Sequence, residues 1–444
     1  MTDEIGVGLH KNDIPAHLVR SVNFDHDTPI LIENAQMERS EGFVRPASDV
    51  KGSNGPYELT IPAVQDAFLV MTNLALYTRC KVVKSNGTDL AATDVVAPVN
   101  QLSTAMWEFI EIFLNDFNIS QTSSSNTNYK TNLETVLSYD VSEKSRSTYL
   151  AATGFSLDTP GHFNSMTEVT EPNGAGNHGY TDRYKMVKNS REFDMMTPVT
   201  ADFVRAQKHL APGNKLSLRF GRAKDSFVLN TASIHSYKLI ITDLRLYFMR
   251  VRATHPIPRT ERYLVTRTEL KKYPVPSGVL NHNCSIHMGG KMPKSVIVAQ
   301  VNTEACEGDY DQNPFYYQHF DIGRIQLTVG TQRMPADALE PNFGQGLVAR
   351  EYVNMFMNTG GYRMNRGNCI TYPAFKDGLT IFPFDLNPDM CNGYHMHESG
   401  VGNIELSINW RNRLESPITI LVHLSYDEVI MRAKNQDGYV IETI

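Results

Sequence analysis

Short runs in which apolar and polar residues alternate dominate the chain. Residues 57–61 (YELTI) and 215–220 (KLSLRF) alternate cleanly, and residues 107–114 (WEFIEIFL) do so in part. Residues 237–252 form a longer run that is rich in β-branched and aromatic side chains. Alternation with a period of two predicts strands with one buried face. Further strands are predicted at residues 67–84, 295–301, 322–329, 379–386, 404–410 and 418–431.

Helical periodicity is rare in comparison. The apolar residues of segment 133–137 predict one short helix, with Thr131 or Asn132 as its N-cap. The apolar residues of segment 347–356 predict a second short helix. Because both are single elements among many strands, the pattern predicts an all-β protein with minor helices.

A weak internal repeat divides the chain into two similar halves. The motif Phe-Asp-apolar at residues 193–195 recurs 191 positions later, at residues 384–386, and a proline follows each copy. The motif apolar-Ser-apolar at residues 216–218 recurs 190 positions later, at residues 406–408. Each half then closes with a long strand and has room for about eight strands, the number in one jelly roll. We therefore expect a double jelly roll.

The repeat also predicts where the domains begin and end. We expect an N-terminal arm and lead-in at residues 1–50, a first jelly roll at residues 51–255, and a second jelly roll with its linker at residues 256–444. The motif His255-Pro256-Ile257-Pro258 marks the joint, because two prolines in three residues end the long strand and stiffen the link. Segments 120–128, 156–182 and 358–368 are rich in small polar residues and predict exposed loops.

Composition and charge exclude several classes of protein. The 444 residues include 42 Lys and Arg against 48 Asp and Glu, a formal net charge of −6, with no basic block. This argues against specific nucleic-acid binding. Five widely spaced cysteines without a CxxC motif predict reduced thiols in a cytosolic or nuclear setting. The acidic start is unlike a secretory signal, and no run of about 18 apolar residues predicts a membrane span.

One histidine group resembles the metal motif of cupins. His395 and His397 would lie on one face of a strand, and Glu398 follows them. However, Glu398 would point to the opposite face, and no third histidine on a strand is evident, although His423 could serve as one. We therefore expect a polar loop here in preference to a metal site.

A second group has spacings that suit zinc. His282, Cys284 and His287 supply three possible zinc ligands, but a structural zinc site needs a fourth ligand and no second Cys/His pair follows. The acidic segment 304–311 lacks the spacing of an EF-hand, so we expect a solvated turn there. The aromatic segment 315–320 predicts packing between sheets or across a subunit contact in preference to a ligand platform.

The sequence contains none of the common catalytic arrangements. Neither a phosphate-binding glycine motif with its lysine nor a GxSxG elbow occurs, and no Cys/His/Asn set stands out. We therefore predict no enzymatic activity, no catalytic residue, no cofactor and no metal. A large two-part β protein of this kind is typical of a structural building block.

Several short motifs, in order along the chain, resemble those of a known family. They are residues 218–227 (LRFGRAKDSF), 241–246 (ITDLRL), 292–298 (MPKSVIV), 313–315 (NPF) with 319–321 (HFD), 349–352 (AREY) and 384–389 (FDLNPD). Their order and spacing are similar to those of hexon-like double jelly-roll major capsid proteins of Maverick/Polinton elements and adintovirus-type DNA viruses. The matching blocks fall within residues 57–431, and residues 1–50 resemble nothing in that family.

The resemblance implies a structural role in a virion. It implies homotrimers that form pseudo-hexagonal capsomers of an icosahedral capsid, with neighbouring capsomers, penton and minor capsid proteins as partners. The protein would be made in the host cytoplasm and assembled in the nucleus or in a cytoplasmic factory. Residues 1–20 would form an arm at the capsid base, and loop 156–182 would belong to an outer tower. The alternatives are a penton or minor capsid protein, a glycan- or receptor-binding β-sandwich, and a bicupin-like metal-binding protein.

Overall fold

A computed structural model shows how the strands are arranged. It describes residues 37–50, 55–120, 125–139, 149–206, 208–253, 260–362, 367–387, 400–435 and 438–443. The segments expected to form the arm (residues 1–20), the Pro-rich joint (255–258) and the cupin-like motif (395–398) lie outside these ranges.

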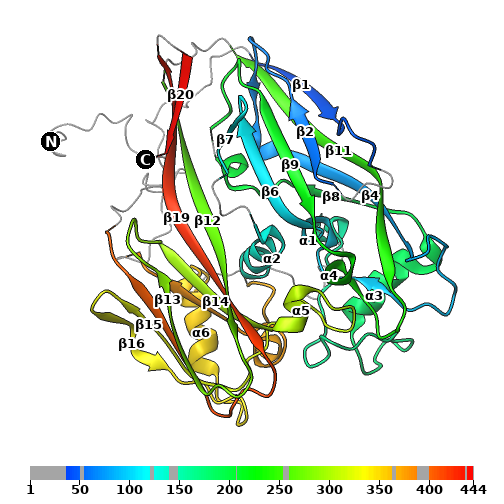
Figure 1. Cartoon of the computed structure of the whole chain (residues 1–444), viewed down its shortest axis with the longest axis vertical. Coiled ribbons are helices and arrows are strands. Elements are labelled where there is room, and N and C mark those ends of the chain that lie inside the picture. The colour runs from blue at the N-terminus through cyan, green and yellow to red at the C-terminus, as the bar shows by residue number, and fades with distance from the viewer. Residues whose placement is uncertain are drawn as a thin grey trace, which may run out of the picture.

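In the described chain, the first roll consists of two antiparallel sheets, one of five strands and one of four (Figure 1). The first sheet has the order β1-β11-β4-β8, and the short β3 (Phe68–Leu69) also pairs with β11. Its main strands are β1 (Met37–Val44), β11 (Tyr237–Ala253), β4 (Ala75–Lys84) and β8 (Phe193–Pro198). The second sheet has the order β2-β9-β6-β7. Its strands are β2 (Tyr57–Ile61), β9 (Leu216–Arg222), β6 (Trp107–Leu114) and β7 (Phe117–Asn118).

A second roll repeats this arrangement. Its first sheet has the order β12-β19-β14-β17, with β20 (Gly438–Thr443) paired to β19, and its second has the order β13-β18-β15-β16. The strands of the first sheet are β12 (Thr260–Val275), β19 (Ile418–Asn435), β14 (Ser295–Asn302) and β17 (Ile381–Asp385). Those of the second are β13 (Asn281–His287), β18 (Ile404–Trp410), β15 (Ile322–Val329) and β16 (Gln332–Leu339).

The two rolls share one topology. The short strands β3, β5 (Ala97–Pro98) and β10 (Leu229–Asn230) and the last strand β20 are additions to the eight main strands of each roll. Numbered from one to eight within its roll, each set of main strands forms sheets of order 1-8-3-6 and 2-7-4-5, which is the jelly-roll arrangement. The repeated sequence motifs occupy equivalent strands: Phe193 and Phe384 lie in the two sixth strands, β8 and β17. Leu216 and Leu406 lie in the two seventh strands, β9 and β18. The prediction of an all-β double jelly roll is therefore confirmed.

Apolar side chains fill the space between the two sheets of each roll. In the first roll, Leu59, Leu218 and Ile112 are paired across three neighbouring strands, and all three are buried. In the second roll, Leu406 pairs with Leu327, and both are buried. Most buried apolar residues of both rolls belong to one continuous cluster, and a second small cluster contains Ala97, Met166, Tyr180 and Tyr184. The two rolls therefore share a core.

Several elements differ from their predicted bounds. The strand predicted at residues 67–84 is interrupted by the short 3₁₀ helix η3 (Met71–Asn73), so that β3 and β4 are separate strands. β1 lies within the segment expected to be an arm and lead-in, and it pairs with β11, so the first sheet begins before residue 51. β12, which the sequence pattern did not reveal, begins at Thr260, after β11 has ended at Ala253. The expected boundary at residues 255–256 falls between these two strands.

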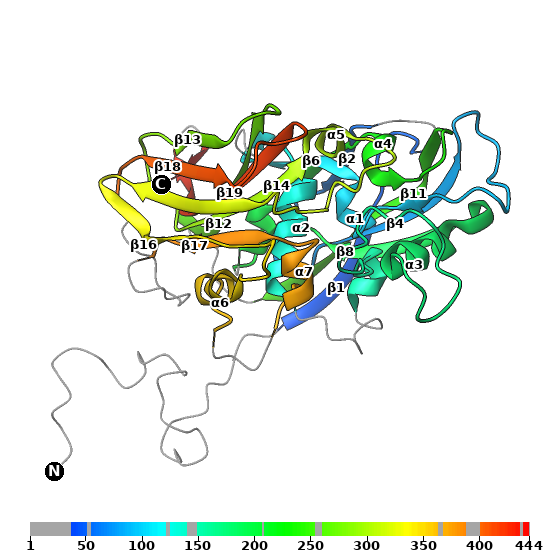
Figure 2. The same ribbon diagram turned by 90° about the horizontal axis from the view of Figure 1, so that it is seen from below.

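The helices lie in the connections between strands. The structure contains α1 (Leu102–Ala105), α2 (Thr127–Ser138), α3 (His178–Val187), α4 (Asp225–Val228), α5 (Thr303–Glu307), α6 (Ala349–Asn358) and α7 (Tyr372–Lys376). α2 and α6 are the two predicted helices. Each follows the fifth strand of its roll and precedes the sixth. Figure 1 shows α2 between the two rolls, and Figure 2 shows α6 beneath β17.

Segment 156–182 is not the long exposed loop that we expected. Asp158, Phe163 and Asn177 are buried, and the segment ends in the first turns of α3. The Asn177 side chain caps α3 by accepting a hydrogen bond from the Tyr180 N–H. The loop folds inward because Arg183 of α3 donates to the carbonyl oxygens of Pro98 and Ser156 and to Asp158. A composition rich in Gly and Asn does not reveal such anchoring.

Candidate functional site: the junction between the rolls and the exposed sheet

Helix α2 packs between the two rolls. It begins at Thr127, earlier than the predicted N-cap at Thr131 or Asn132. Its first turns are buried, because it packs against β6 and α1 of the first roll and against β12 of the second. Tertiary packing therefore extends the helix beyond the segment whose periodicity predicts it.

Asp202 connects α2 with the second roll. It lies in the short helix η8 (Asp202–Arg205) and forms an ion pair with Lys130 of α2. The Thr268 N–H of β12 donates to Asp202 Oδ2 over 2.9 Å, and the Thr268 hydroxyl donates to Asp202 Oδ1 over 3.0 Å. The Asp202 carboxylate thus accepts from three donors, one in the first roll and two in the second. Such charge-assisted hydrogen bonds are stronger than neutral ones.

Glu134, one turn after Lys130, makes a second polar connection. Its carboxylate lies 2.5 Å from Arg205 of η8, and its Oε1 lies 3.3 Å from Nε2 of His423 in β19. Burial alone would raise the pKa of Glu134. The charge of Arg205, the hydrogen bond with His423 and the charge of Lys130 outweigh that effect and hold the pKa well below its ordinary value. Glu134 is therefore a partly buried carboxylate whose charge both rolls stabilise.

Aromatic side chains complete the junction. The Tyr129 ring of α2 meets Phe315 edge to face at 5.6 Å between ring centroids. The buried Tyr317 hydroxyl donates to Asn132 Oδ1 over 2.8 Å. The aromatic segment 315–320 therefore packs where the two rolls meet, in agreement with the interpretation as packing in preference to a ligand platform.

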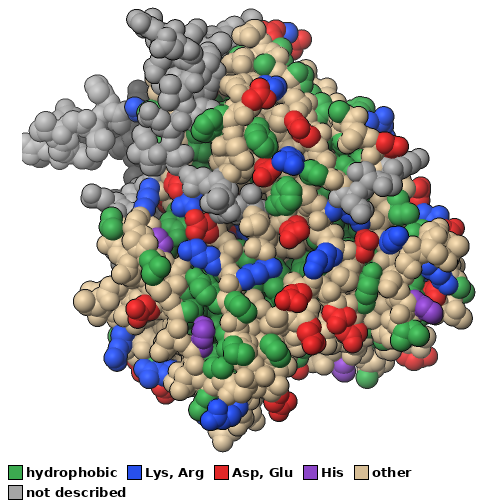
Figure 3. All heavy atoms as spheres, in the orientation of Figure 1, with side chains coloured by type: hydrophobic (Ala, Val, Ile, Leu, Met, Phe, Trp, Pro, Cys, Tyr) green, Lys and Arg blue, Asp and Glu red, His purple; other side chains and the backbone are tan. Residues whose placement is uncertain are grey.

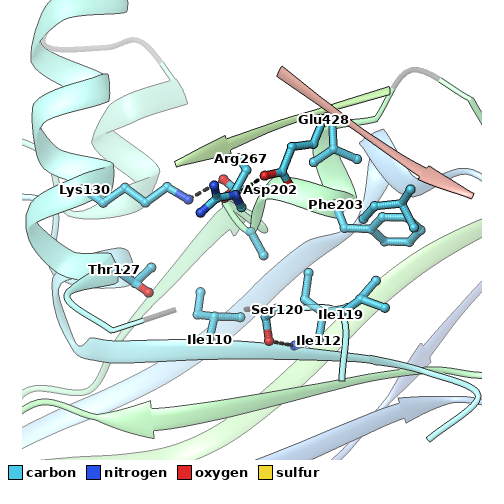
Figure 4. Close-up of a pocket in the computed structure, with 13 residues that line it drawn as sticks. Ile110, Ile112, Ile119, Ser120, Thr127, Lys130, Asp202, Phe203, Arg267 and Glu428 are labelled. Atoms are coloured by element: carbon cyan, nitrogen blue, oxygen red, sulfur yellow. Dashed lines mark hydrogen bonds and ion pairs between the residues drawn. The ribbon is translucent and has the colours of Figure 1, made fainter. Parts of the chain in front are cut away.

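A small cavity remains inside the junction (Figure 4). Its volume is about 50 Å³. The first roll lines it with β6, with α2 and with the segment after β8, which includes Phe203. The second roll closes it with Val265 and Arg267 of β12 and with Glu428 and Ile430 of β19. The first and eighth strands of the second roll thus cover the open end of the first roll.

Segment 156–182, which we call the anchored loop, makes a second contact between the rolls. Asp158 pairs with Arg183 at 2.7 Å, and both side chains are almost fully buried. The Asn313 side chain donates to Asp158 Oδ2 and to the Phe163 carbonyl oxygen. Phe163 in turn stacks on Tyr316 with 5.4 Å between ring centroids. A loop of the first roll and a loop of the second are therefore held together by a buried ion pair and stacked rings.

The first sheet of the first roll leaves one face exposed. The Arg245 guanidinium lies 5.4 Å from the centroid of the Phe43 ring and 5.7 Å from that of Tyr77, and Tyr77 meets Tyr247 edge to face. We call Phe43, Tyr77, Arg245 and Tyr247 the aromatic–arginine patch. Arginine and aromatic residues are enriched in the cores of protein–protein interfaces. Phe43 is 48% exposed, so the patch is accessible in the single chain.

The zinc-like group does not form a metal site. His282 and Cys284 lie in β13, and a register shift separates Ser285 from His287. Burial raises the pKa of the Cys284 thiol to about 11, which opposes the thiolate that zinc requires. Burial also lowers the pKa of His282 and of His287. Within the residues that the structure describes, no three His, Cys, Asp or Glu side chains come together as a metal site.

The acidic segment 304–311 ends α5 and continues into a turn. Burial and the neighbouring charge of Asp309 raise the pKa of Asp311, because the two carboxylates repel each other.

No helix in the described ranges is long and apolar enough to cross a membrane.

The residues that join the rolls were not identified from the sequence. Asp202, Glu134 and Arg205 carry no motif, and their partners are distant along the chain. Thr268 is 66 positions from Asp202, and His423 is 289 positions from Glu134. The available signal was the spacing of Lys130 and Glu134, which places a basic and an acidic side chain on one face of a helix.

Comparisons with known proteins agree with this architecture. No known protein family matches the chain. The protein F54H12.2 of Caenorhabditis elegans, described as uncharacterized, is 20% identical over 399 residues, which cover 85% of this chain and 91% of that protein. A chain of the Sputnik virophage structure is 11% identical, with a TM-score of 0.60 over 97% of this chain and 93% of that one. The Faustovirus major capsid protein is 9% identical, with a TM-score of 0.57 over 93% of each chain.

The strand order and these similarities define the fold. Both rolls have the jelly-roll arrangement, and the similar viral chains match nearly the whole length of this one. The chain therefore has the double jelly-roll fold of these viral proteins.

Proposed function

We propose that this chain is a major capsid protein, a structural building block of the icosahedral shell of a DNA virus or virus-like element. In this proposal three copies form a pseudo-hexagonal capsomer. The observation that carries it is the pair of rolls with identical strand order, joined through a buried junction. Two similar, firmly joined rolls per chain let three chains present six similar units in a ring.

The further parts of the proposal follow from the same role. The protein would act in the virion without enzymatic activity, in contact with neighbouring capsomers and with penton and minor capsid proteins. Its lineage would be that of Maverick/Polinton elements and adintovirus-type viruses, which the sequence motifs resemble. Residues 51–255, together with β1, would form the first domain, and residues 256–444 the second.

The charge distribution supports a shell component. On the face shown in Figure 3, basic and acidic side chains are intermixed with apolar ones over the described surface. A protein that binds nucleic acid through its phosphates concentrates Lys and Arg on one face. The visible face and the net charge of −6 therefore suit contacts between proteins.

The native mass of the purified protein tests the proposal. Light scattering after gel filtration is expected to give about three times the chain mass of 49.9 kDa. Electron microscopy of the concentrated protein is then expected to show hexagonal capsomers. A stable monomer across a hundredfold range of concentration would contradict the proposed trimer.

A further inference from the structure

The end of the second roll contains an open hollow. We define it by Met292, Met334, Met357, Phe384 and Leu386, which line it together with polar residues. Its volume is about 690 Å³, against about 50 Å³ for the cavity in the junction. Methionine side chains adapt their shape to a partner, so an apolar hollow of this composition suits a protein contact.

Equivalent elements surround the open hollow and the junction cavity. The junction cavity is lined by the fourth strand of the first roll, by the helix before the sixth strand and by the segment after the sixth strand. The hollow is lined by the fourth and fifth strands of the second roll, β15 and β16, by the corresponding helix α6, and by β17 with the segment after it. Residues 292–294, Gly400 and Asp427 of β19 also line it. The two sites are therefore partial counterparts: they share the fourth strand, the helix before the sixth strand and the segment after the sixth strand, whereas residues 292–294 and Asp427 line the hollow alone.

Only one of these counterparts is covered. In the junction, the first and eighth strands of the second roll, β12 and β19, close the cavity. Among the described residues that line the hollow, none comes from the first or eighth strand of the first roll. In the part of the chain that the structure describes, the first roll thus receives the second, and the first and eighth strands of the first roll do not contribute to the hollow.

The strands that would complete the hollow carry an exposed surface. The first and eighth strands of the first roll are β1 and β11, and their outward face holds Phe43, Arg245 and Tyr247 of the aromatic–arginine patch. Beside the hollow of the second roll, α6 presents Val353 and Met357, which are four residues apart on one helix face and each 42% exposed. Both surfaces have apolar contact area that the single chain leaves uncovered.

We propose that the hollow and α6 of one copy receive β1, β11 and the aromatic–arginine patch of a second copy. This inference rests on the proposed capsomer function and names the contact that builds it. The two surfaces differ, so the contact is head-to-tail, and such a contact forms a ring if its rotation closes. Because it repeats the relation between the two rolls of one chain, three copies would close a ring of six rolls.

Charged substitutions on either surface test the contact. Met357→Asp on α6 and Phe43→Asp on β1 each place a carboxylate in the proposed interface, at side chains that are partly exposed in the single chain. Each variant is expected to lower the native mass threefold, from trimer to monomer, with an unchanged circular dichroism spectrum. Met357→Leu keeps an apolar side chain and is expected to remain trimeric. Ile234→Asp, at a side chain that is 97% exposed outside both surfaces, is the matched control and is expected to remain trimeric.

Mixing the two variants tests the head-to-tail arrangement. The Met357→Asp copy retains its sheet surface, and the Phe43→Asp copy retains its α6 surface, so one intact contact remains between them. An equimolar mixture is expected to form a heterodimer of about twice the chain mass. Trimeric single variants, or a mixture that stays monomeric, would overturn this interface while the trimer of the unaltered chain still supported the capsomer. A monomeric unaltered chain would overturn both proposals.

Discussion

The Glu134 carboxylate shows how single side chains hold the two rolls together. It lies on α2 of the first roll and contacts Arg205 of η8 and His423 of β19. Isolated in an apolar environment, a carboxylate would take up a proton, and its pKa would rise. Here two cations and a histidine outweigh the effect of burial and hold the pKa well below its ordinary value. The folded state is therefore stabilised by the ionised form of this residue.

This low pKa predicts a contribution to stability that depends on pH. A depressed pKa stabilises the folded state above the unfolded value of about 4.3, and the stabilisation is lost as the pH falls through the folded value. The difference in free energy of unfolding between the unaltered chain and Glu134→Gln is therefore expected to be largest above about pH 5. Below about pH 4.3 it should shrink by up to about 1.4 kcal/mol per pH unit.

Urea unfolding at several pH values measures this difference. Glu171→Gln makes the same chemical change at an exposed position and serves as the control. A difference for Glu134→Gln that stayed constant between pH 6 and pH 3 would show that the carboxylate is not stabilised in the folded protein.

Strands illustrate what periodicity predicts at the scale of an element. β15 and β18 have the bounds predicted from their alternation, and β11 agrees to within one residue. β12 was missed, although its residues Glu261, Tyr263 and Val265 are buried at alternate positions. Several charged residues interrupt its apolar pattern, and they are accommodated by ion pairs such as that of Arg267 with Glu428. Periodicity does not reveal a buried face that contains paired charges.

The eighth strand of the first roll offers a test of the assigned faces. Leu246 of β11 is fully buried, so Leu246→Ala is expected to lower the free energy of unfolding by about 2–5 kcal/mol, through lost burial and the cavity that remains. Leu264→Ala on β12 is the control. This leucine is 47% exposed, and its replacement is expected to cost less than about 1 kcal/mol. Chemical denaturation measures both changes. A loss below about 0.5 kcal/mol for Leu246→Ala would mean that β11 presents the other face to the core.

At the scale of the whole molecule, the two rolls are one unit. One apolar cluster extends through both rolls, and α2, η8 and the anchored loop connect the rolls with ion pairs and hydrogen bonds. A subunit of a shell must keep its two rolls in one relative orientation for its contacts with neighbours to repeat. The junction provides that rigidity in the proposed capsomer.

Calorimetry tests whether the junction couples the rolls. The unaltered chain is expected to unfold in a single transition, with equal calorimetric and van't Hoff enthalpies. Asp202→Ala removes the partner of the buried Lys130 and the acceptor of Thr268, so we expect it to cost about 3–5 kcal/mol and to raise the ratio of calorimetric to van't Hoff enthalpy above one. Asp116→Ala breaks an exposed ion pair with Lys215 and is expected to cost less than about 1 kcal/mol. An Asp202→Ala variant that unfolds like the unaltered chain would show that the rolls do not depend on this contact.

The sequence by itself determined the class of elements and their duplication, but it left several strands unidentified, among them β12, β13 and β16. Alternation of side chains is a local property of a strand, and the two repeated motifs lie in equivalent strands because the rolls have the same topology. The tertiary structure alone decided which side chains meet at the junction and which surfaces stay exposed. Thr268 and His423 of the second roll meet Asp202 and Glu134 of the first through the packing of the two rolls. Such contacts depend on the packing of the whole chain, which no local pattern of residues encodes.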